Sequence, residues 1–334
     1  MQTPFWLPIW QAAASLLSVA TEVTVVLPVM VLLCLLLGRR RQREAMGRTG
    51  QLFLHIALVT AFFGAVDIAG HGFVSLQAIP ASMDKLVPVP FDPFSLPWRA
   101  TCTSLASWAL GGLCLGICAL FARPIFRTAA FSMDEDTLKA MDKKALAASA
   151  AALVAFACFF AAIILRNWPF LGLPEQMTQE TVFQVLLKHS WRQSCAALMP
   201  AGGIAVFSLF LQLPGLSREQ KQVERENRRQ EVIPGTVPET LPLSDVESTA
   251  FRMCAAFALA GATFQLLDAG FLAFSSVAAL GSGFTSALMR FGPFLVTAGS
   301  LACWAFIFVR PRRNMLFLAL LPVLLILLRA VGRF

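Results

Sequence analysis

Residues 51–78 read QLFLHIALVTAFFGAVDIAGHGFVSLQA, and this stretch decides the class of fold. Its titratable side chains are His55, Asp67 and His71, and every other position is apolar, small or neutral. A membrane span needs ~20 predominantly apolar residues, and this stretch exceeds that length. It therefore predicts a transmembrane helix, and it raises the question why Asp67 and His71 lie inside it, four residues apart.

The whole chain has the composition of a polytopic membrane protein. Of its 334 residues, 57% are hydrophobic and 14% are charged, whereas soluble domains carry about 25% charged residues. The net charge of +8 lies in short clusters between apolar runs, so membrane topology explains it better than binding to nucleic acid. Eight runs are long enough to span: about 12–38, 51–78, 100–122, 146–166, 190–213, 250–275, 288–309 and 314–331.

The eight cysteines show no metal-binding spacing. All of them lie in apolar segments, and none forms CxxC, CxxCH or a paired Cys/His pattern. This argues against a zinc site, covalently bound haem or an iron–sulfur cluster held by this chain. We expect no metal site, and core packing is the better interpretation of Cys114 and Cys118, which share a helix face.

Lys and Arg are distributed unequally between the two sides of the expected membrane. Eighteen of the 27 lie in the connections that follow the first, third, fifth and seventh spans, and eight lie on the opposite side. Short loops rich in Lys and Arg stay in the cytoplasm, so these four connections are expected to be inner loops. Both termini are then expected on the outer, periplasmic side.

An internal repeat suggests that the chain consists of two halves. With a shift of 201 residues, ALVTAFFGAVD (57–67) pairs with ALAGATFQLLD (258–268), and Asp67 then corresponds to Asp268. Each half would contain four spans, an even number, so the halves would run in the same direction. We therefore expect an all-α integral membrane protein with eight transmembrane helices in two parallel four-helix halves.

The expected boundaries follow from this plan. Residues 217–247 form a charged run followed by a Pro-rich stretch, which we interpret as part of a solvated linker, with partner docking as the alternative. The expected parts are spans one to three with an inner loop (1–145), spans four and five (146–213), the charged and Pro-rich inner linker (214–247), and spans six to eight (248–334). The two repeats would cover about 12–166 and 190–331.

Ionisable residues inside the spans gather in the outer half of the expected membrane. Along span two, Asp67 lies ~24 Å and His71 ~30 Å from the inner end, and their spacing places them on one helix face. Glu22 in span one and Asp268 in span six also fall in the outer half. Basic residues border this region at the outer ends of other spans, namely Arg99, His189, Arg192, Arg290, Arg329 and Arg333.

A charged group at this depth is costly, so it usually faces a cavity or a partner. Each buried Asp either takes part in a site or pairs with an Arg of a neighbouring helix and only fixes helix packing. His71 is either a ligand-binding residue or a satisfied core histidine. Glu22 has local hydroxyl partners in Thr21 and Thr24. The residue pattern leaves these alternatives open.

Several of these features together resemble a known family. The eight expected spans with both ends outward, the sequence AGHGF around His71, and a last span closing on RAVGRF (329–334) are similar to the membrane-anchor subunits of DMSO reductase-type molybdoenzymes. These belong to the wider NrfD/polysulfide-reductase group of quinol-interacting anchors. The final GRF, with Arg333, matches the glycine–arginine–aromatic signature of the family's last span. In departure from the family, Arg329 replaces a usual acidic residue, and the chain contains no Tyr.

The resemblance implies a quinol/quinone-interacting anchor of a respiratory oxidoreductase complex, multi-pass in the bacterial cytoplasmic (inner) membrane. It implies menaquinone or ubiquinone as the molecule handled near the outer face. It also implies an iron–sulfur partner subunit of the four-cluster ferredoxin-like type and a molybdopterin or other catalytic subunit. The chain would then be a non-catalytic subunit in anaerobic electron transport.

Roles for individual residues follow from the same resemblance. A histidine near the outer end of span two is implicated in quinol binding in that family, and His71 occupies the matching place. Quinol oxidation releases two protons with two electrons, so His71 would bind one quinol oxygen, and Asp67 would support it or receive the proton. The remaining expected site residues, for the proton path and for binding of the quinol, are Glu22, Arg99, His189, Arg192, Asp268 and Arg333.

Three other functions fit parts of the pattern. His71 and His189 would supply two axial ligands for a single b-type haem. A pair of Asp residues in equivalent spans of a pseudo-repeat fits a proton-coupled secondary transporter. A purely structural anchor would bind no quinone.

Overall fold

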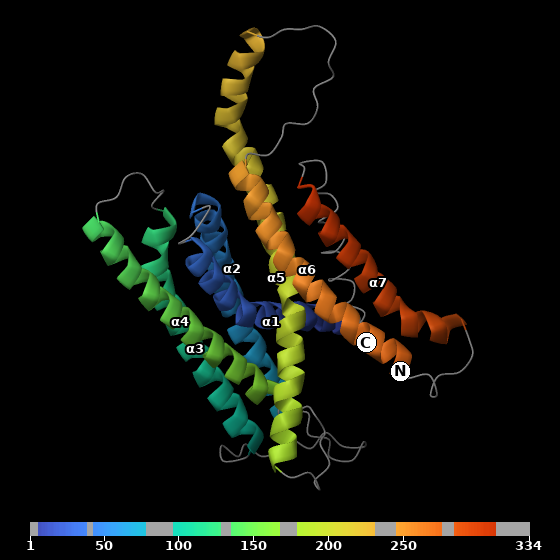
Figure 1. Cartoon of the computed structure of the whole chain (residues 1–334). Coiled ribbons are helices and arrows are strands. Elements are labelled where there is room, and N and C mark those ends of the chain that lie inside the picture. Colours follow the sequence, from blue (N-terminus) through green and yellow to red (C-terminus); the bar gives the residue numbers. More distant parts are fainter. Residues whose placement is uncertain are drawn as a thin grey trace. The chain divides into compact units, whose positions relative to one another are not determined.

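The computed structural model describes residues 6–38, 43–77, 96–127, 135–167, 179–230, 245–275 and 284–311, and the regular structure within these ranges is α-helical. Figure 1 shows the helices: α1 (Trp6–Gly38), α2 (Arg43–Gln77), α3 (Leu96–Arg127), α4 (Glu135–Asn167), α5 (Gln179–Gln230), α6 (Asp245–Ser275) and α7 (Phe284–Val309). A helix satisfies its backbone N–H and C=O groups internally, which a chain in hydrocarbon requires.

Seven of the described helices are long and apolar enough to cross a bilayer. Their membrane-length segments are Leu16–Leu37, Ala45–Gly70, Arg99–Phe126, Ala140–Asn167, Phe183–Leu211, Val246–Phe271 and Phe291–Val309. Seven of the eight expected spans are thus confirmed as helices, and the chain is a multi-pass membrane protein. The eighth expected span, about 314–331, lies outside the described residues, and the side of the membrane on which each terminus lies remains a prediction.

The described helices belong to two units. The first comprises the described residues up to Ala197, with α1 to α4 and the beginning of α5. The second begins at Leu198 and contains the rest of α5 with α6 and α7. The division therefore falls inside α5, within the fifth expected span.

Helix α5 continues beyond its apolar part. Its membrane-length segment ends at Leu211, but the helix runs on to Gln230 through the charged sequence SREQKQVERENRRQ. Acids and bases three or four residues apart, such as Glu224 and Arg228, favour a helix. The charged beginning of the expected inner linker is therefore helical, while its Pro-rich part, 231–244, lies outside the described residues.

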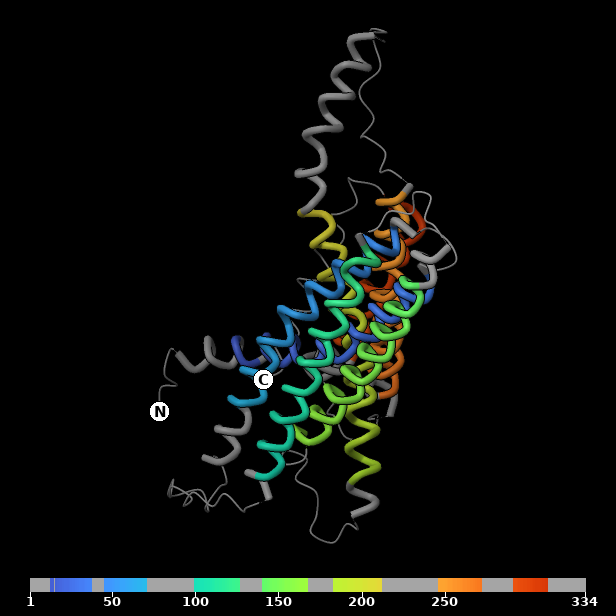
Figure 2. The backbone as a smooth tube through the Cα atoms, turned by 90° about the vertical axis from the view of Figure 1, so that its left-hand side faces the viewer, coloured from blue at the N-terminus to red at the C-terminus, as the bar shows by residue number. Residues whose placement is uncertain are grey.

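The buried face of α4 is made mainly of alanine. Leu146 is 69% exposed and Leu153 is 56% exposed, so these two large side chains face outward, whereas Phe159 and Ile163 are buried. Small residues inward and large ones outward are typical of helices packed in lipid, because small side chains let the backbones approach. Accordingly, α3 and α4 lie side by side in both views (Figure 1, Figure 2). The buried stripe consists of Ala145, Ala148, Ala152, Ala155, Phe159 and Ala162.

Polar side chains connect α3 to the helices on either side of it. Ser104 and Ser107 donate hydrogen bonds to backbone oxygens of α4, both at 2.8 Å. The Trp108 indole N–H donates to the Ala61 oxygen of α2 at 2.9 Å. A Cβ at Gly64 would overlap the indole ring, so α2 needs glycine at this crossing.

In the second unit, α5 and α6 cross with their backbones in contact. A Cβ added at Gly202 would lie 2.5 Å from the Ala258 nitrogen and 2.6 Å from the Cys254 oxygen. A Cβ added at Gly261 would overlap the backbone of Met199. Glycine at both positions permits the close approach that stabilises helix pairs in a membrane.

Candidate functional site

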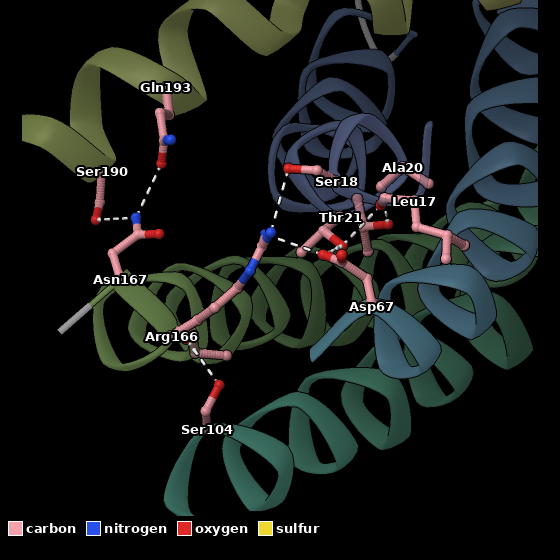
Figure 3. Close-up of polar contacts among 12 residues, drawn as sticks. Leu17, Ser18, Ala20, Thr21, Asp67, Ser104, Arg166, Asn167, Ser190 and Gln193 are labelled. Atoms are coloured by element: carbon pink, nitrogen blue, oxygen red, sulfur yellow. Dashed lines mark hydrogen bonds and ion pairs between the residues drawn. The ribbon is translucent and has the colours of Figure 1, made fainter. Parts of the chain in front are cut away.

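A buried ion pair joins α2 to α4 in the first unit (Figure 3). Arg166 Nη1 lies 3.0 Å from Asp67 Oδ2, and the two side chains are 9% and 1% exposed. Either charge alone at this depth would cost several kcal/mol, and their mutual attraction and hydrogen bonding offset that cost. Of the alternatives for Asp67, pairing with an Arg of a neighbouring helix is confirmed, and this pairing leaves a further role of Asp67 open.

Helix α1 supplies two hydroxyl groups to this ion pair. Thr21 Oγ1 lies 2.5 Å from Asp67 Oδ2 and 3.0 Å from the Leu17 oxygen. A hydroxyl has one proton, so the shorter contact with the charged acceptor is the bond it donates. Ser18 Oγ accepts a hydrogen bond from Arg166 Nη2 at 3.2 Å. We name Ser18, Thr21, Asp67 and Arg166 the Asp67 cluster.

The register of α2 places Asp67 in the interior. Asp67 continues a buried stripe at intervals of three and four residues, which is the spacing of one helix face. Position 71 is the next in the same register. The preceding positions of the stripe are Phe53, Ala57, Thr60 and Gly64.

Arg166 reaches the cluster from the end of a helix. It lies in the last turn of α4, where the helix dipole favours a positive charge. Its long aliphatic stem can cover apolar surface while the guanidinium reaches polar partners. Ser18 and Thr21 are three residues apart in α1, so both face the same way. The cluster thus follows from helix periodicity on α1 and α2 and from a helix terminus on α4.

The next residue of α4, Asn167, extends the polar contacts to α5. Its Nδ2 donates to Gln193 Oε1 at 2.9 Å and lies 3.4 Å from Ser190 Oγ, whose side chain is buried. Figure 3 shows the neighbouring side chains pointing apart, with Arg166 toward α1 and α2 and Asn167 toward α5. The last two residues of α4 therefore contact three other helices of the first unit, namely α1, α2 and α5.

The contacts of Arg166 and Thr21 with Asp67 end on the same carboxylate oxygen. Oδ2 receives the Arg166 guanidinium and the Thr21 hydroxyl. A proton transferred to Oδ2 would therefore have to displace one of these two donors. The two contacts therefore hold the Asp67 carboxylate at a fixed place between α1, α2 and α4.

The structure describes Glu22 fully but only the helix position of His71, and these are the two residues expected nearest to Asp67. His71 belongs to α2, four residues after Asp67, but its side chain lies outside the described part of the structure. Glu22 directly follows Thr21 in α1 and is half-buried. The expected support of His71 by Asp67 therefore stays a prediction. Thr21, which precedes Glu22 in the sequence, donates a hydrogen bond to Asp67.

The remaining expected site residues belong to other segments of the sequence. Arg99 at the start of α3 is exposed, and so are His189 and Arg192 on α5. Asp268 is half-buried in α6 of the second unit, and Arg333 lies outside the described residues. Their roles in quinol binding and proton transfer remain predictions.

Arg166 and Asn167 are not among the site residues expected from the sequence. Arg166 contributes there only to the charge balance, because an Arg at the end of an apolar run is also typical of a membrane boundary. A weak signal was present, since Ser18 and Thr21 place two hydroxyls on one face of an apolar helix. The partner of each polar face depends on which helices pack together, and local sequence does not specify that.

Comparison with known proteins found no match to this chain among family models, curated proteins or solved structures.

Proposed function

We propose that the chain is the quinol/quinone-interacting anchor subunit of a respiratory oxidoreductase complex in the bacterial inner membrane. The observation that carries the proposal is the buried carboxylate of Asp67, held by Arg166 and Thr21 one helical turn before His71. The membrane-length helices and the sequences AGHGF and GRF support it. A lipid-soluble hydroquinone is a substrate that reaches such a depth.

The proposed chemistry begins with proton removal from the ring hydroxyl. Quinol oxidation releases two protons and two electrons, so a base within hydrogen-bond reach is needed. Neutral histidine suits this task near neutral pH, and His71 accepts the first proton. Asp67, held in place by Arg166 and Thr21, then supports the imidazolium as a counter-charge or receives the proton from it. Glu22 or Asp268 extends the proton path.

The remaining parts of the proposal concern binding and partners. Arg99, His189, Arg192 and Arg333 bind the quinol or stabilise negative charge on it. The two electrons pass to an iron–sulfur partner subunit, and from there to a molybdopterin or other catalytic subunit on the outer side. Purification in mild detergent tests this part: iron and molybdenum are expected to copurify with the chain.

Substitution of the base tests the proposal directly. In native membranes supplied with a reduced menaquinol analogue, His71→Ala is expected to lower turnover by about 10²-fold or more, the usual contribution of a general base. Asp67→Asn should also lower it. His55→Ala is the matched control, since His55 lies on the same helix, is exposed and has no assigned role. Wild-type turnover and analogue binding in both site variants would rule out this site.

A proton-coupled secondary transporter is the second candidate. It is favoured by the buried pairing of an acid with an Arg between helices, since intramembrane acids commonly serve proton relays. This function predicts proton uptake by vesicles that contain the chain alone, without metal-containing subunits. A reduced-minus-oxidised visible spectrum of the purified protein tests the third alternative, a single b-type haem.

A further inference from the structure

The Asp67 cluster supports an inference about control of the proposed quinol site, and it rests on that proposed function. Arg166 holds α2 through Asp67 and α1 through Ser18. We infer that Arg166 is a positioning residue for quinol oxidation: it clamps Asp67 against α1 and thereby sets the place and the charge environment of the helical turn that carries His71.

The contacts form a closed circuit of three helices. Arg166 Nη1 contacts Asp67 and Nη2 contacts Ser18, so the two branches of one planar guanidinium reach two helices. Thr21 then connects α1 back to Asp67 at 2.5 Å. Because the circuit reaches Asp67 from both α4 and α1, the carboxylate cannot shift without breaking a contact. A lysine at position 166 would keep the positive charge, but its single ammonium group lacks the two branches with which the guanidinium reaches Asp67 and Ser18.

The helix transmits this position to His71. Four residues of α-helix correspond to a rise of ~6 Å, and a packed helix moves as a unit over that distance. Proton transfer depends strongly on placement, and a shift of ~1 Å can cost about 10²-fold in rate. A contact at Asp67 is therefore close enough to control the reaction at position 71 without touching the substrate.

Neutralisation of both charges separates a positioning role from a merely structural one. Asp67→Asn or Arg166→Gln alone leaves one buried charge without its partner, so each single variant is expected at reduced abundance in the membrane. The double variant Asp67→Asn/Arg166→Gln contains no such charge and is expected near wild-type abundance. If the pair only stabilises the fold, the double variant will also recover full activity.

The expected result is that abundance recovers while turnover does not. With a reduced menaquinol analogue in native membranes, the double variant should show kcat lowered about 10-fold or more with KM changed less than about two-fold, the pattern of an interaction used in the transition state. Asp142→Asn/Lys143→Gln is the matched control, because it neutralises one acid and one base at exposed positions of α4. Wild-type kcat and KM in the Asp67/Arg166 double variant would overturn the inference.

Two further variants decide the matter if the double variant does not accumulate. Ser18→Ala and Thr21→Val keep both charges but remove the anchors to α1, and kcat should fall about three-fold or more in each, as part of the cost of misplacement. Thr60→Val is their control, since the buried Thr60 hydroxyl donates to carbonyls of its own helix. Wild-type kcat in Ser18→Ala and Thr21→Val contradicts the clamp. Lack of quinol turnover and binding in wild-type membranes would instead refute the proposed function itself.

Discussion

Asp67 occupies a position that apolar packing would normally give to Leu or Ala. It lies in the buried stripe of α2, and the donors from Arg166 and Thr21 offset the cost of burying a carboxylate there. An acid in an apolar helix is compatible with a functional site and with a packing contact. The cluster shows the packing contact, and the site remains a prediction. A test of function therefore has to separate the effect of the Asp67 charge on turnover from its effect on the stability of the protein.

Gly64 lies one turn before Asp67 and controls how closely α2 approaches α3. Gly64→Val is expected to destabilise the protein by about 1–3 kcal/mol, because the indole of Trp108 would have to move. Trp108 cannot move freely, since it is 3% exposed and its N–H is bonded to Ala61. Denaturation of the purified protein in mixed detergent micelles measures the change.

Gly112→Ala serves as the control for this prediction. A Cβ at Gly112 meets nothing within 4 Å, so the substitution should leave stability unchanged or raise it slightly. Equal stability of Gly64→Val and wild type would show that the crossing of α2 and α3 is looser than described.

At the scale of elements, the helices of the first unit are joined by small residues and by polar contacts at their ends. The Ala stripe brings α4 close to its neighbours, and the Arg166–Asn167 pair at its end adds contacts with α1, α2 and α5. Apolar packing between helices in lipid is not driven by the hydrophobic effect, so such close fits and hydrogen bonds decide which helices associate.

The first turns of α5, around Ser190 and Gln193, are expected to loosen when Asn167 is replaced. Asn167→Ala removes the bonds to Gln193 and Ser190, worth about 0.5–1.5 kcal/mol each. Amide hydrogen exchange should therefore accelerate in these turns of α5, while exchange in α2 stays unchanged. Thr103→Val is the control, because Thr103 is exposed and bonds within its own helix. Unchanged exchange in α5 would show that other contacts hold its first turns.

In the second unit, the crossing of α5 and α6 depends on Gly261. Gly261→Val should destabilise this unit by about 3 kcal/mol, because the added atoms meet the backbone of Met199, which cannot rotate away as a side chain can. Thermal unfolding in detergent provides the measurement. Gly299→Ala, where a Cβ meets nothing within 4 Å, should behave like wild type, and a loss of stability there would undermine the comparison.

At the scale of the whole molecule, the asymmetry of Lys and Arg predicts the direction in which the helices cross. Fusion of alkaline phosphatase after the last residue is expected to be active, because that enzyme folds only on the outer side. Fusion of a green fluorescent protein between 231 and 244 should fluoresce, because that connection is predicted to be inner. The reversed pattern would overturn the expected outward termini, and with them the placement of Asp67 in the outer half.

The sequence alone predicts the class of fold and the positions of most transmembrane helices. Long apolar runs, interrupted by short basic connections, predict a multi-pass α-helical membrane protein, and seven described helices match seven of the predicted spans. This works because insertion into a bilayer depends on local apolar length, and each helix satisfies its own backbone. The charged extension of α5 to Gln230 was not recognised as helix, because a search for apolar runs detects only the part in the membrane.

Only the tertiary structure decided the partners of Asp67. Thr21 lies 46 residues from it in sequence, and the contact between Ser18 and Arg166 spans 148 residues. Helix periodicity predicts which face of α2 carries the carboxylate, but each apolar helix has several faces able to pack in lipid. Which face meets which neighbour depends on the fit of Ala and Gly surfaces and on the pairing of buried charges, and these become determined when the helices assemble.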